Sequence, residues 1–155
     1  MSRDEFTLLF PNRVRWAEVD RQDVVFNPHY FTYFDLAVCE YWRAARIAYP
    51  KGYVDVYGCD TFAVKATAQF HASARYDELL ELGCRVTRIG ASSLVFSLGV
   101  WREDEHLTSG ELVYVNTDLA TRSATPWPEA FVASVLAFER VAPRVAVAAP
   151  ARASE

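Results

Sequence analysis

Residues 28–48 read PHYFTYFDLAVCEYWRAARIA, and this stretch decides the fold. Its apolar residues recur at three-to-four spacing, which places them on one face of an α-helix. That face consists of Tyr30, Phe34, Ala37, Val38, Tyr41, Trp42 and Ala45. Asn27 is placed to cap the helix and Pro28 to occupy its first position, where a missing N–H does no harm. The spacing therefore predicts a long helix that runs to about Ala48 and buries a wide face.

Strand patterns lie on both sides of this helix. Before it, residues 6–19 partly alternate between apolar and polar residues around Pro11, which predicts a bent strand. After a loop or short helical turn at residues 51–59, strands are predicted at 61–76, 79–89, 93–102 and 107–118, and a terminal helix at 129–140. A single apolar helix covered by an antiparallel sheet buries both apolar faces, so the predicted class is α+β.

Length and composition are those of one domain. The chain has 155 residues, of which 52% are hydrophobic and 14% aromatic, enough for a substantial core. We predict a single domain over residues 1–142 and a disordered tail over residues 143–155. No stretch has the length of a membrane span and no secretion signal is recognisable, so we expect a cytoplasmic protein with reduced cysteines and no membrane partner.

The charge and the motifs exclude several function classes. The net charge of -4 argues against a nucleic-acid partner, because affinity for phosphate backbones comes from clustered Lys and Arg. The sequence has no Gly-rich phosphate loop, no G-x-S-x-G and no H-E-x-x-H. Cys39 is expected to pack on the helix, and His71 and His106 have no metal-ligand spacing. We therefore expect no metal and no cofactor.

The segment DRQDVVFNPHY, residues 20–30, carries the most chemistry. It places the carboxylate of Asp20 shortly before the helix start. The free N–H groups at a helix start can polarise a carbonyl, and a carboxylate nearby can act as nucleophile or as base for water. This combination suits acyl transfer. A turn or capping role is the common alternative for an aspartate at such a position.

The same segment, followed by Phe34 and Asp35, resembles the active-site segment of the 4-hydroxybenzoyl-CoA thioesterase family, a branch of the hot-dog superfamily. Residues 75–82, 86–96 and 110–126 resemble the later strands of that family in the same order. The resemblance implies a hot-dog fold, in which a curved antiparallel sheet wraps a long central helix. It also implies an acyl-CoA thioesterase, which hydrolyses an acyl- or aryl-CoA thioester to a free acid and coenzyme A.

The resemblance implies roles for single residues. Asp20 matches the catalytic carboxylate, as nucleophile or general base, and the N–H of Asn27 matches the group that polarises the thioester oxygen. Asp35 matches an acidic helix residue, which we place at the site wall or subunit interface. Asp23 stands where the family has glycine, so it is either a tolerated left-handed residue or a second carboxylate in the site. The expected substrate-binding residues around them are Val25, Phe26, Pro28, His29 and Tyr30.

Coenzyme A is part of the substrate in this prediction. Its phosphates require arginine or lysine, and Arg85 and Arg88 are the predicted phosphate-binding residues, with Arg122 third. By resemblance, we expect a homodimer or homotetramer with the site at a subunit interface. Two alternatives remain open from sequence: a hydratase or dehydratase acting on acyl thioesters, and a non-catalytic acyl-CoA binding protein.

Overall fold

A computed structural model describes residues 2–146 of the chain. The elements in chain order are η1 (Arg3–Glu5), β1 (Leu8–Arg13), η2 (Trp16–Glu18), α1 (His29–Ala44), α2 (Lys51–Tyr57), β2 (Cys59–Phe70), β3 (Leu79–Ile89), β4 (Ser93–Arg102), β5 (Glu105–Asp118), α3 (Glu129–Phe138) and β6 (Arg144–Val145). None of the helices in residues 2–146 is long and apolar enough to cross a membrane.

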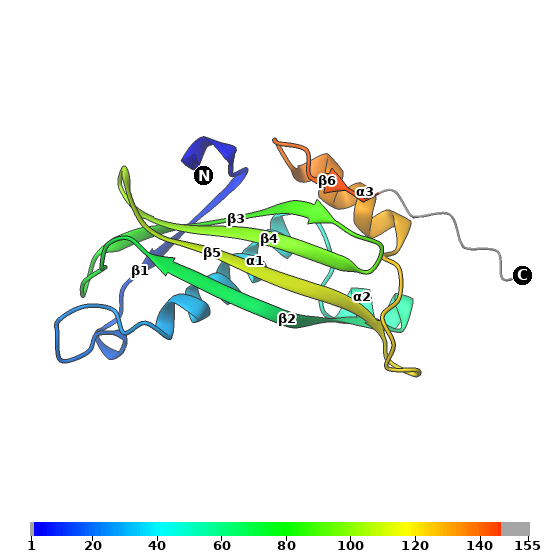
Figure 1. Cartoon of the computed structure of the whole chain (residues 1–155), viewed down its shortest axis with the longest axis horizontal. Coiled ribbons are helices and arrows are strands. Elements are labelled where there is room, and N and C mark those ends of the chain that lie inside the picture. The colour runs from blue at the N-terminus through cyan, green and yellow to red at the C-terminus, as the bar shows by residue number, and fades with distance from the viewer. Residues whose placement is uncertain (1, 147–155) are drawn as a thin grey trace, which may run out of the picture.

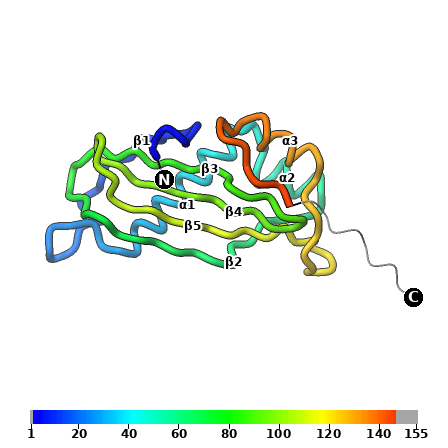
Figure 2. Tube along the Cα trace, turned by 45° about the horizontal axis from the view of Figure 1, so that its top comes forward, coloured from blue at the N-terminus to red at the C-terminus, as the bar shows by residue number. Residues whose placement is uncertain are grey.

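One sheet carries the fold, and α1 lies against one of its faces (Figure 1). The strand order is β1-β3-β4-β5-β2, with antiparallel neighbours throughout, and β6 pairs in parallel with β3. β3, β4 and β5 form a meander, whereas β2 pairs with β5 and leaves its other edge open. Figure 2 shows the strands passing over α1. The predicted α+β class, with a long helix wrapped by a curved antiparallel sheet, is confirmed.

The apolar face of α1 fills the inside of the sheet. All seven residues of the predicted stripe are buried, and Tyr33 joins them. The sheet allows this close approach through Gly110 of β5, because a Cβ there would lie 2.3 Å from Cε2 of Phe34. The helix ends earlier than predicted, at Ala44, since Arg46 takes a left-handed φ of 58° and turns the chain toward α2.

Other element boundaries also differ from the prediction. β1 ends at Arg13 because η2 follows, so the predicted strand over 6–19 is too long. β2 ends at Phe70, where the amides of His71 and Ala72 both donate to the carbonyl of Leu107. Within the tail predicted at 143–155, Arg144 and Val145 form β6, and residues 147–155 lie outside the described part of the chain.

The face of the sheet opposite α1 is partly covered by the N-terminal segment. Phe6 packs against Trp101 with ring centroids 4.9 Å apart, and Arg85 of β3 forms an ion pair with Glu5. At one end of the molecule α3 closes the core, where Phe131 stacks on Trp127 with centroids 4.5 Å apart. The loop over residues 14–28 lies at the opposite end of the sheet, beside the start of α1 (Figure 1).

Candidate active site

Residues 18–26 form a tight hairpin that leads into α1. Val19 and Val25 make an antiparallel bridge, and the N–H of Phe26 donates to the carbonyl of Glu18 at 2.9 Å. The N–H of Asp20 donates to the carbonyl of Val24, also at 2.9 Å. Asp20 is therefore held on one arm of a small hydrogen-bonded unit, and the other arm continues directly to the helix start.

The carboxylate of Asp20 is half-buried, and one of its oxygens is engaged. Oδ1 accepts a hydrogen bond of 2.7 Å from the N–H of Gln22, and the N–H of Asp23 donates to the carbonyl of Asp20. Asp20 thus fills the turn role that its sequence position suggests. Within residues 2–146 no group donates to Oδ2 and no cation pairs with the carboxylate. One oxygen is therefore available to a ligand while the other holds the turn.

Asp23 occupies a left-handed backbone position, with φ of 60°. Such a position favours glycine, and aspartate is among the few other residues that adopt it readily. The hairpin therefore retains the turn geometry that a glycine would permit. The side chain of Asp23 is exposed and takes part in no hydrogen bond within the described chain.

The start of α1 differs from the prediction in one detail. Pro28 is the N-cap, His29 begins the helix, and no side chain caps it, so Asn27 lies one residue before the cap. The amides of His29 and Tyr30 donate to the carbonyls of Phe26 and Asn27. The N–H of Asn27 itself has no acceptor among residues 2–146. Asn27 thus carries a free, exposed amide donor at this end of the helix.

The other predicted substrate residues divide into two groups. Phe26 and Pro28 are exposed and His29 is half-buried, so all three can meet a ligand. Val25 and Tyr30 are both only 2% exposed. The N–H of Val25 donates to the carbonyl of Ala74, and the hydroxyl of Tyr30 accepts from the N–H of Ala74 at 3.1 Å. These two residues anchor the hairpin to the β2–β3 connection, with their side chains in the core.

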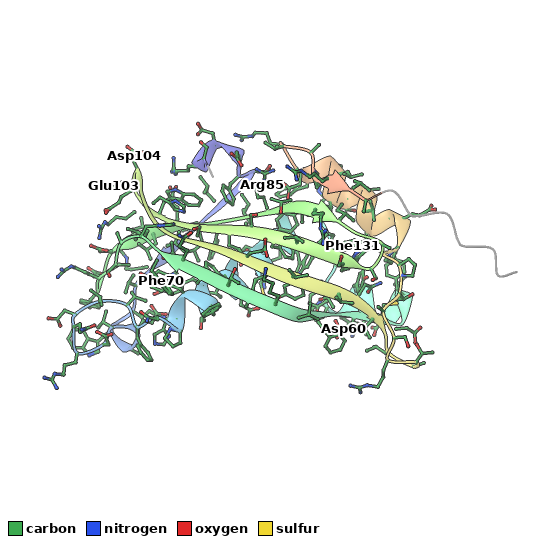
Figure 3. The ribbon with its side chains drawn as sticks, in the orientation of Figure 1. Asp60, Phe70, Arg85, Glu103, Asp104 and Phe131 are labelled. Carbon is green, nitrogen blue, oxygen red and sulfur yellow. The ribbon has the colours of Figure 1, made fainter. Side chains whose placement is uncertain are left out.

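Exposed aromatic side chains surround the same end of the molecule. Trp16 is 73% exposed and meets Tyr76 edge-to-face at 5.1 Å. Phe70 is at the end of β2 that lies beside the hairpin loop, where it contacts Tyr30 (Figure 3). Phe26, an expected substrate-binding residue, is also exposed at this end, whereas the sequence patterns did not point to Phe70 and Tyr76.

Arg85 and Arg88 lie elsewhere in the protomer, toward the far end of β3 and on the face opposite α1 (Figure 3 labels Arg85). They line a cavity of about 840 Å³ together with Arg144. Arg85 is buried and pairs with Glu5 at 2.5 Å, whereas Arg88 has no carboxylate partner within residues 2–146. One protomer therefore does not bring Arg85 and Arg88 to Asp20.

The cysteine thiols and the histidines His71 and His106 are weaker candidates for catalysis than the Asp20 carboxylate. Burial raises the pKa of Cys39, Cys59 and Cys84, which keeps these thiols protonated at neutral pH. His71 and His106, which are far apart in sequence, have ring centroids 4.9 Å apart. Among residues 2–146 there is no cluster of three or more His, Cys, Asp or Glu that could hold a metal ion.

Sequence reasoning missed Glu18 and Tyr33. Glu18 lies two residues before Asp20 and is only 2% exposed, whereas charged residues are seldom fully buried unless they are paired. Its carboxylate accepts a hydrogen bond of 2.7 Å from the hydroxyl of Tyr33. Tyr33 lies one position before Phe34, a residue of the predicted stripe. Its burial means that the buried face of α1 is wider than the sequence pattern predicted.

A sheet wrapped around one long helix, with a carboxylate and a free amide on a loop at the helix start, is an arrangement that could serve acyl transfer. Residues 22–109 match the family model of the thioesterase superfamily, and the chain belongs to that superfamily. It is a thioester hydrolase with the hot-dog fold. The match begins at Gln22, so Asp20 lies just outside it.

Individual relatives agree with this assignment. The chain is 28% identical over 140 residues to the acyl-CoA thioester hydrolase YbgC of Escherichia coli, which covers 82% of this chain and 96% of the relative. Among solved structures, a hypothetical protein from Thermus thermophilus superposes with a TM-score of 0.77 at 24% identity, covering 85% of this chain and 99% of that one. A 1,4-dihydroxy-2-naphthoyl-CoA thioesterase from Synechocystis superposes with a TM-score of 0.76 at 16% identity, covering 83% and 94%. At these sequence identities, the two structural matches support the fold assignment alone.

Proposed function

We propose that this thioester hydrolase acts on acyl- or aryl-CoA substrates, with Asp20 as the catalytic carboxylate and the Asn27 amide as the oxyanion donor. One observation carries the proposal. The carboxylate has a free oxygen and the amide has no acceptor, and both belong to one hydrogen-bonded loop at the start of α1. Hydrolysis of a thioester requires an acceptor and a donor of this kind, and one short loop carries both.

In the proposed reaction, the thioester oxygen accepts a hydrogen bond from the Asn27 N–H, which stabilises the negative charge that develops on attack. Asp20 either removes a proton from the attacking water or attacks the carbonyl carbon itself. The C–S bond then breaks, and the coenzyme A thiolate leaves and takes up a proton. Attack by Asp20 gives an acyl anhydride when the C–S bond breaks, and water then hydrolyses that anhydride to release the acid and restore the carboxylate. The products are a carboxylic acid and free coenzyme A. We propose that protein groups and water suffice, without a metal or cofactor.

A second copy of the chain is part of this proposal. The free edge of β2 exposes Phe62 at 45% and Val64 at 61%, and Phe31 on the neighbouring α1 is 40% exposed. Exposed apolar residues on an unpaired strand edge favour pairing with another copy. If two β2 strands pair antiparallel, the Cys59 end of the partner lies beside the Phe70 end here, next to the Asp20 hairpin. The substrate site is then formed between two subunits of a homodimer, and two dimers can associate as a homotetramer.

The exposed aromatic residues suggest which acyl groups the enzyme prefers. Trp16, Phe26, Phe70 and Tyr76 offer exposed aromatic contact at the end of the molecule that carries Asp20. We propose aryl or bulky apolar acyl groups as the preferred substrates. Thiol release from a panel of aryl-, short- and long-chain acyl-CoA esters tests this, and hydration of enoyl-CoA, assayed in parallel, separates a hydrolase from a hydratase. The three free cysteines support the proposed cytoplasmic location.

Arg85 and Arg88 remain the proposed phosphate-binding residues. Because they lie away from Asp20 of their own subunit, the coenzyme A that they bind must belong to a substrate whose thioester lies in the site of a neighbouring subunit. Arg88 is the better candidate because Glu5 already pairs with Arg85. Arg88→Gln should raise KM for a CoA thioester about tenfold, the loss expected for one charge-assisted contact. KM for the matching pantetheine thioester, which lacks the nucleotide, should not change. Equal effects on both substrates would remove Arg88 from this role.

Asp20→Asn is the decisive test of the mechanism. The asparagine oxygen can still accept from the N–H of Gln22, so the turn and the fold should persist. We expect kcat to fall at least about a hundredfold, as for loss of a positioned acid or base. Asp23→Asn removes a second carboxylate from the same hairpin and should leave kcat within about twofold of wild type if Asp20 alone is catalytic. An active Asp20→Asn enzyme would exclude the mechanism, and loss of activity in Asp23→Asn alone would transfer the role to Asp23.

A further inference from the structure

Glu18 is a buried carboxylate that the proposed reaction does not use. Its side chain is 2% exposed and makes four hydrogen bonds. One oxygen accepts from the backbone N–H of Arg15 at 2.8 Å and from the hydroxyl of Tyr33 at 2.7 Å. The other oxygen accepts twice from the guanidinium of Arg15. A carboxylate this fully bonded is fixed in one orientation.

The ionisation states follow from these contacts. Burial opposes ionisation of Glu18, but the hydrogen bonds from Arg15 and Tyr33 outweigh it and lower the pKa of the carboxyl. Burial and the adjacent Glu18 carboxylate raise the pKa of Tyr33, so its hydroxyl remains a donor. The contact between them is therefore a hydrogen bond from a neutral phenol to a carboxylate, one of the stronger kinds in proteins.

The position of this bond matters more than its strength. Tyr33 belongs to α1, whereas Glu18 begins the hairpin that carries Asp20, and the backbone carbonyl of Glu18 accepts from Phe26 to close that hairpin. Among residues 2–146 it is the one side-chain hydrogen bond that joins the segment 15–27 to α1. It sets the segment that carries both Asp20 and Asn27 in place against α1.

We propose that Glu18 and Tyr33 are positioning residues for the hydrolysis, holding the segment that carries the Asp20 carboxylate and the Asn27 amide in one place against α1. Neither residue touches the substrate. The inference rests on the proposed roles of Asp20 and Asn27. Misplacement of a reacting group by about 1 Å can lower a rate a hundredfold, so loss of the one side-chain hydrogen bond between this segment and α1 has kinetic consequences.

The chain supplies a matched control at the other end of α1. Tyr41 is also fully buried, and its hydroxyl also donates to a buried carboxylate, that of Glu139, at 2.8 Å. Tyr33→Phe and Tyr41→Phe therefore remove the same atom from equivalent contacts on one helix. They differ in that only Tyr33 leads to the Asp20 hairpin.

The experiment compares kcat, KM and Tm for Tyr33→Phe, Glu18→Gln, their double mutant and Tyr41→Phe, all in the full chain. We expect Tyr33→Phe to lower kcat about tenfold or more with KM changed less than about threefold, because binding is kept and alignment is lost. Tyr41→Phe should lower Tm by a similar amount and leave kcat within about twofold. The effects of Glu18→Gln and Tyr33→Phe on kcat should be non-additive in the double mutant, because both break the same bond.

Equal kcat values for Tyr33→Phe and Tyr41→Phe would overturn the inference and leave Tyr33 with a structural role. Additive losses in the double mutant would also overturn it. Asp20→Asn separates this failure from failure of the proposed mechanism. An inactive Asp20→Asn enzyme beside a fully active Tyr33→Phe enzyme removes the positioning role alone, whereas an active Asp20→Asn enzyme removes the mechanism on which it rests.

Discussion

The hydroxyl of Tyr41 donates a hydrogen bond of 2.8 Å to the buried carboxylate of Glu139, which follows α3. The same carboxylate oxygen accepts from the backbone N–H of Val86 at 2.5 Å, while the other oxygen has no partner among residues 2–146. Glu139 thereby ties α1, α3 and β3 together at one point. An oxygen buried without a partner disfavours the charged form of the group.

The pKa of Glu139 is raised, chiefly by burial, against the opposing effects of Val86, Tyr41 and Arg85. Because the folded chain holds this proton more tightly than the unfolded chain, the contribution to stability is complete below the ordinary value of 4.5 and is lost as pH rises through the raised folded value. The unfolding free energy of wild type should therefore fall, relative to Glu139→Gln, as pH rises from about 4 to 8.

Urea denaturation at a series of pH values measures this difference. Glu18→Gln serves as the control with the opposite sign. The pKa of Glu18 is lowered, so its contribution is present above 4.5 and is lost as pH falls through the folded value. Parallel curves for wild type and Glu139→Gln would show that Glu139 titrates normally in the folded chain.

Gly110→Ala tests the packing of α1 on the sheet. A Cβ at this position would lie 2.3 Å from Phe34, so the helix must shift or the ring must turn. We expect thermal or urea unfolding to show a loss of about 1–3 kcal/mol, typical of overpacking in a core. Phe34→Leu in the same chain removes part of the ring and should recover some of the loss. Two fully additive destabilisations would mean that Phe34 is not the group that excludes a side chain at residue 110.

Substitutions at Asp23 test the turn of the active-site hairpin. Glycine accepts a φ of 60° without strain, so Asp23→Gly should change stability by no more than about 0.5 kcal/mol and should keep the activity. A β-branched residue is strongly disfavoured there, so Asp23→Val should cost about 1–2 kcal/mol and lower kcat. Gln22→Val controls for the added apolar surface, because Gln22 has no positive φ. Equal kcat in the two valine variants would argue that the turn does not control Asp20.

The proposed dimer predicts an effect at the middle of β2. Val64 lies at the midpoint of Cys59–Phe70, so antiparallel pairing about a two-fold axis brings Val64 close to its own copy. Val64→Lys would place two like charges together and should weaken association at least about tenfold. Light scattering over a concentration series measures this, and thioester hydrolysis should fall with the dimer fraction.

Val56→Lys is the matched control for that experiment. Val56 is 69% exposed, similar to Val64 at 61%, but it belongs to α2 and not to the strand β2. It should leave association and activity unchanged. A wild-type chain that is monomeric and active, or an unaffected Val64→Lys variant, would rule out an interface at this edge.

The parts of the molecule that depend on local patterns were predictable. The stripe on α1 and the strand regions follow from backbone periodicity, because residues that share a face of one element share its environment. The candidate pair Asp20 and Asn27 was named from the resemblance of residues 20–30 to a family segment, which local sequence can carry because both residues lie in one short stretch before a helix. The left-handed conformation at Asp23 could be expected from the sequence because aspartate is one of the few residues that tolerate it.

Contacts between segments that are distant in sequence could not be predicted from such local patterns. The position of β2 beside β5 and the pairing of Arg85 with Glu5 depend on how the sheet closes. Tyr33 meets Glu18, and Tyr41 meets Glu139, only after α1 has docked against the hairpin and α3. The sequence by itself determined the elements and the reactive segment, because each depends on neighbours along the chain. The tertiary structure decided which buried groups hold that segment in place, because hydrogen bonds between side chains require both partners to arrive at one point in space.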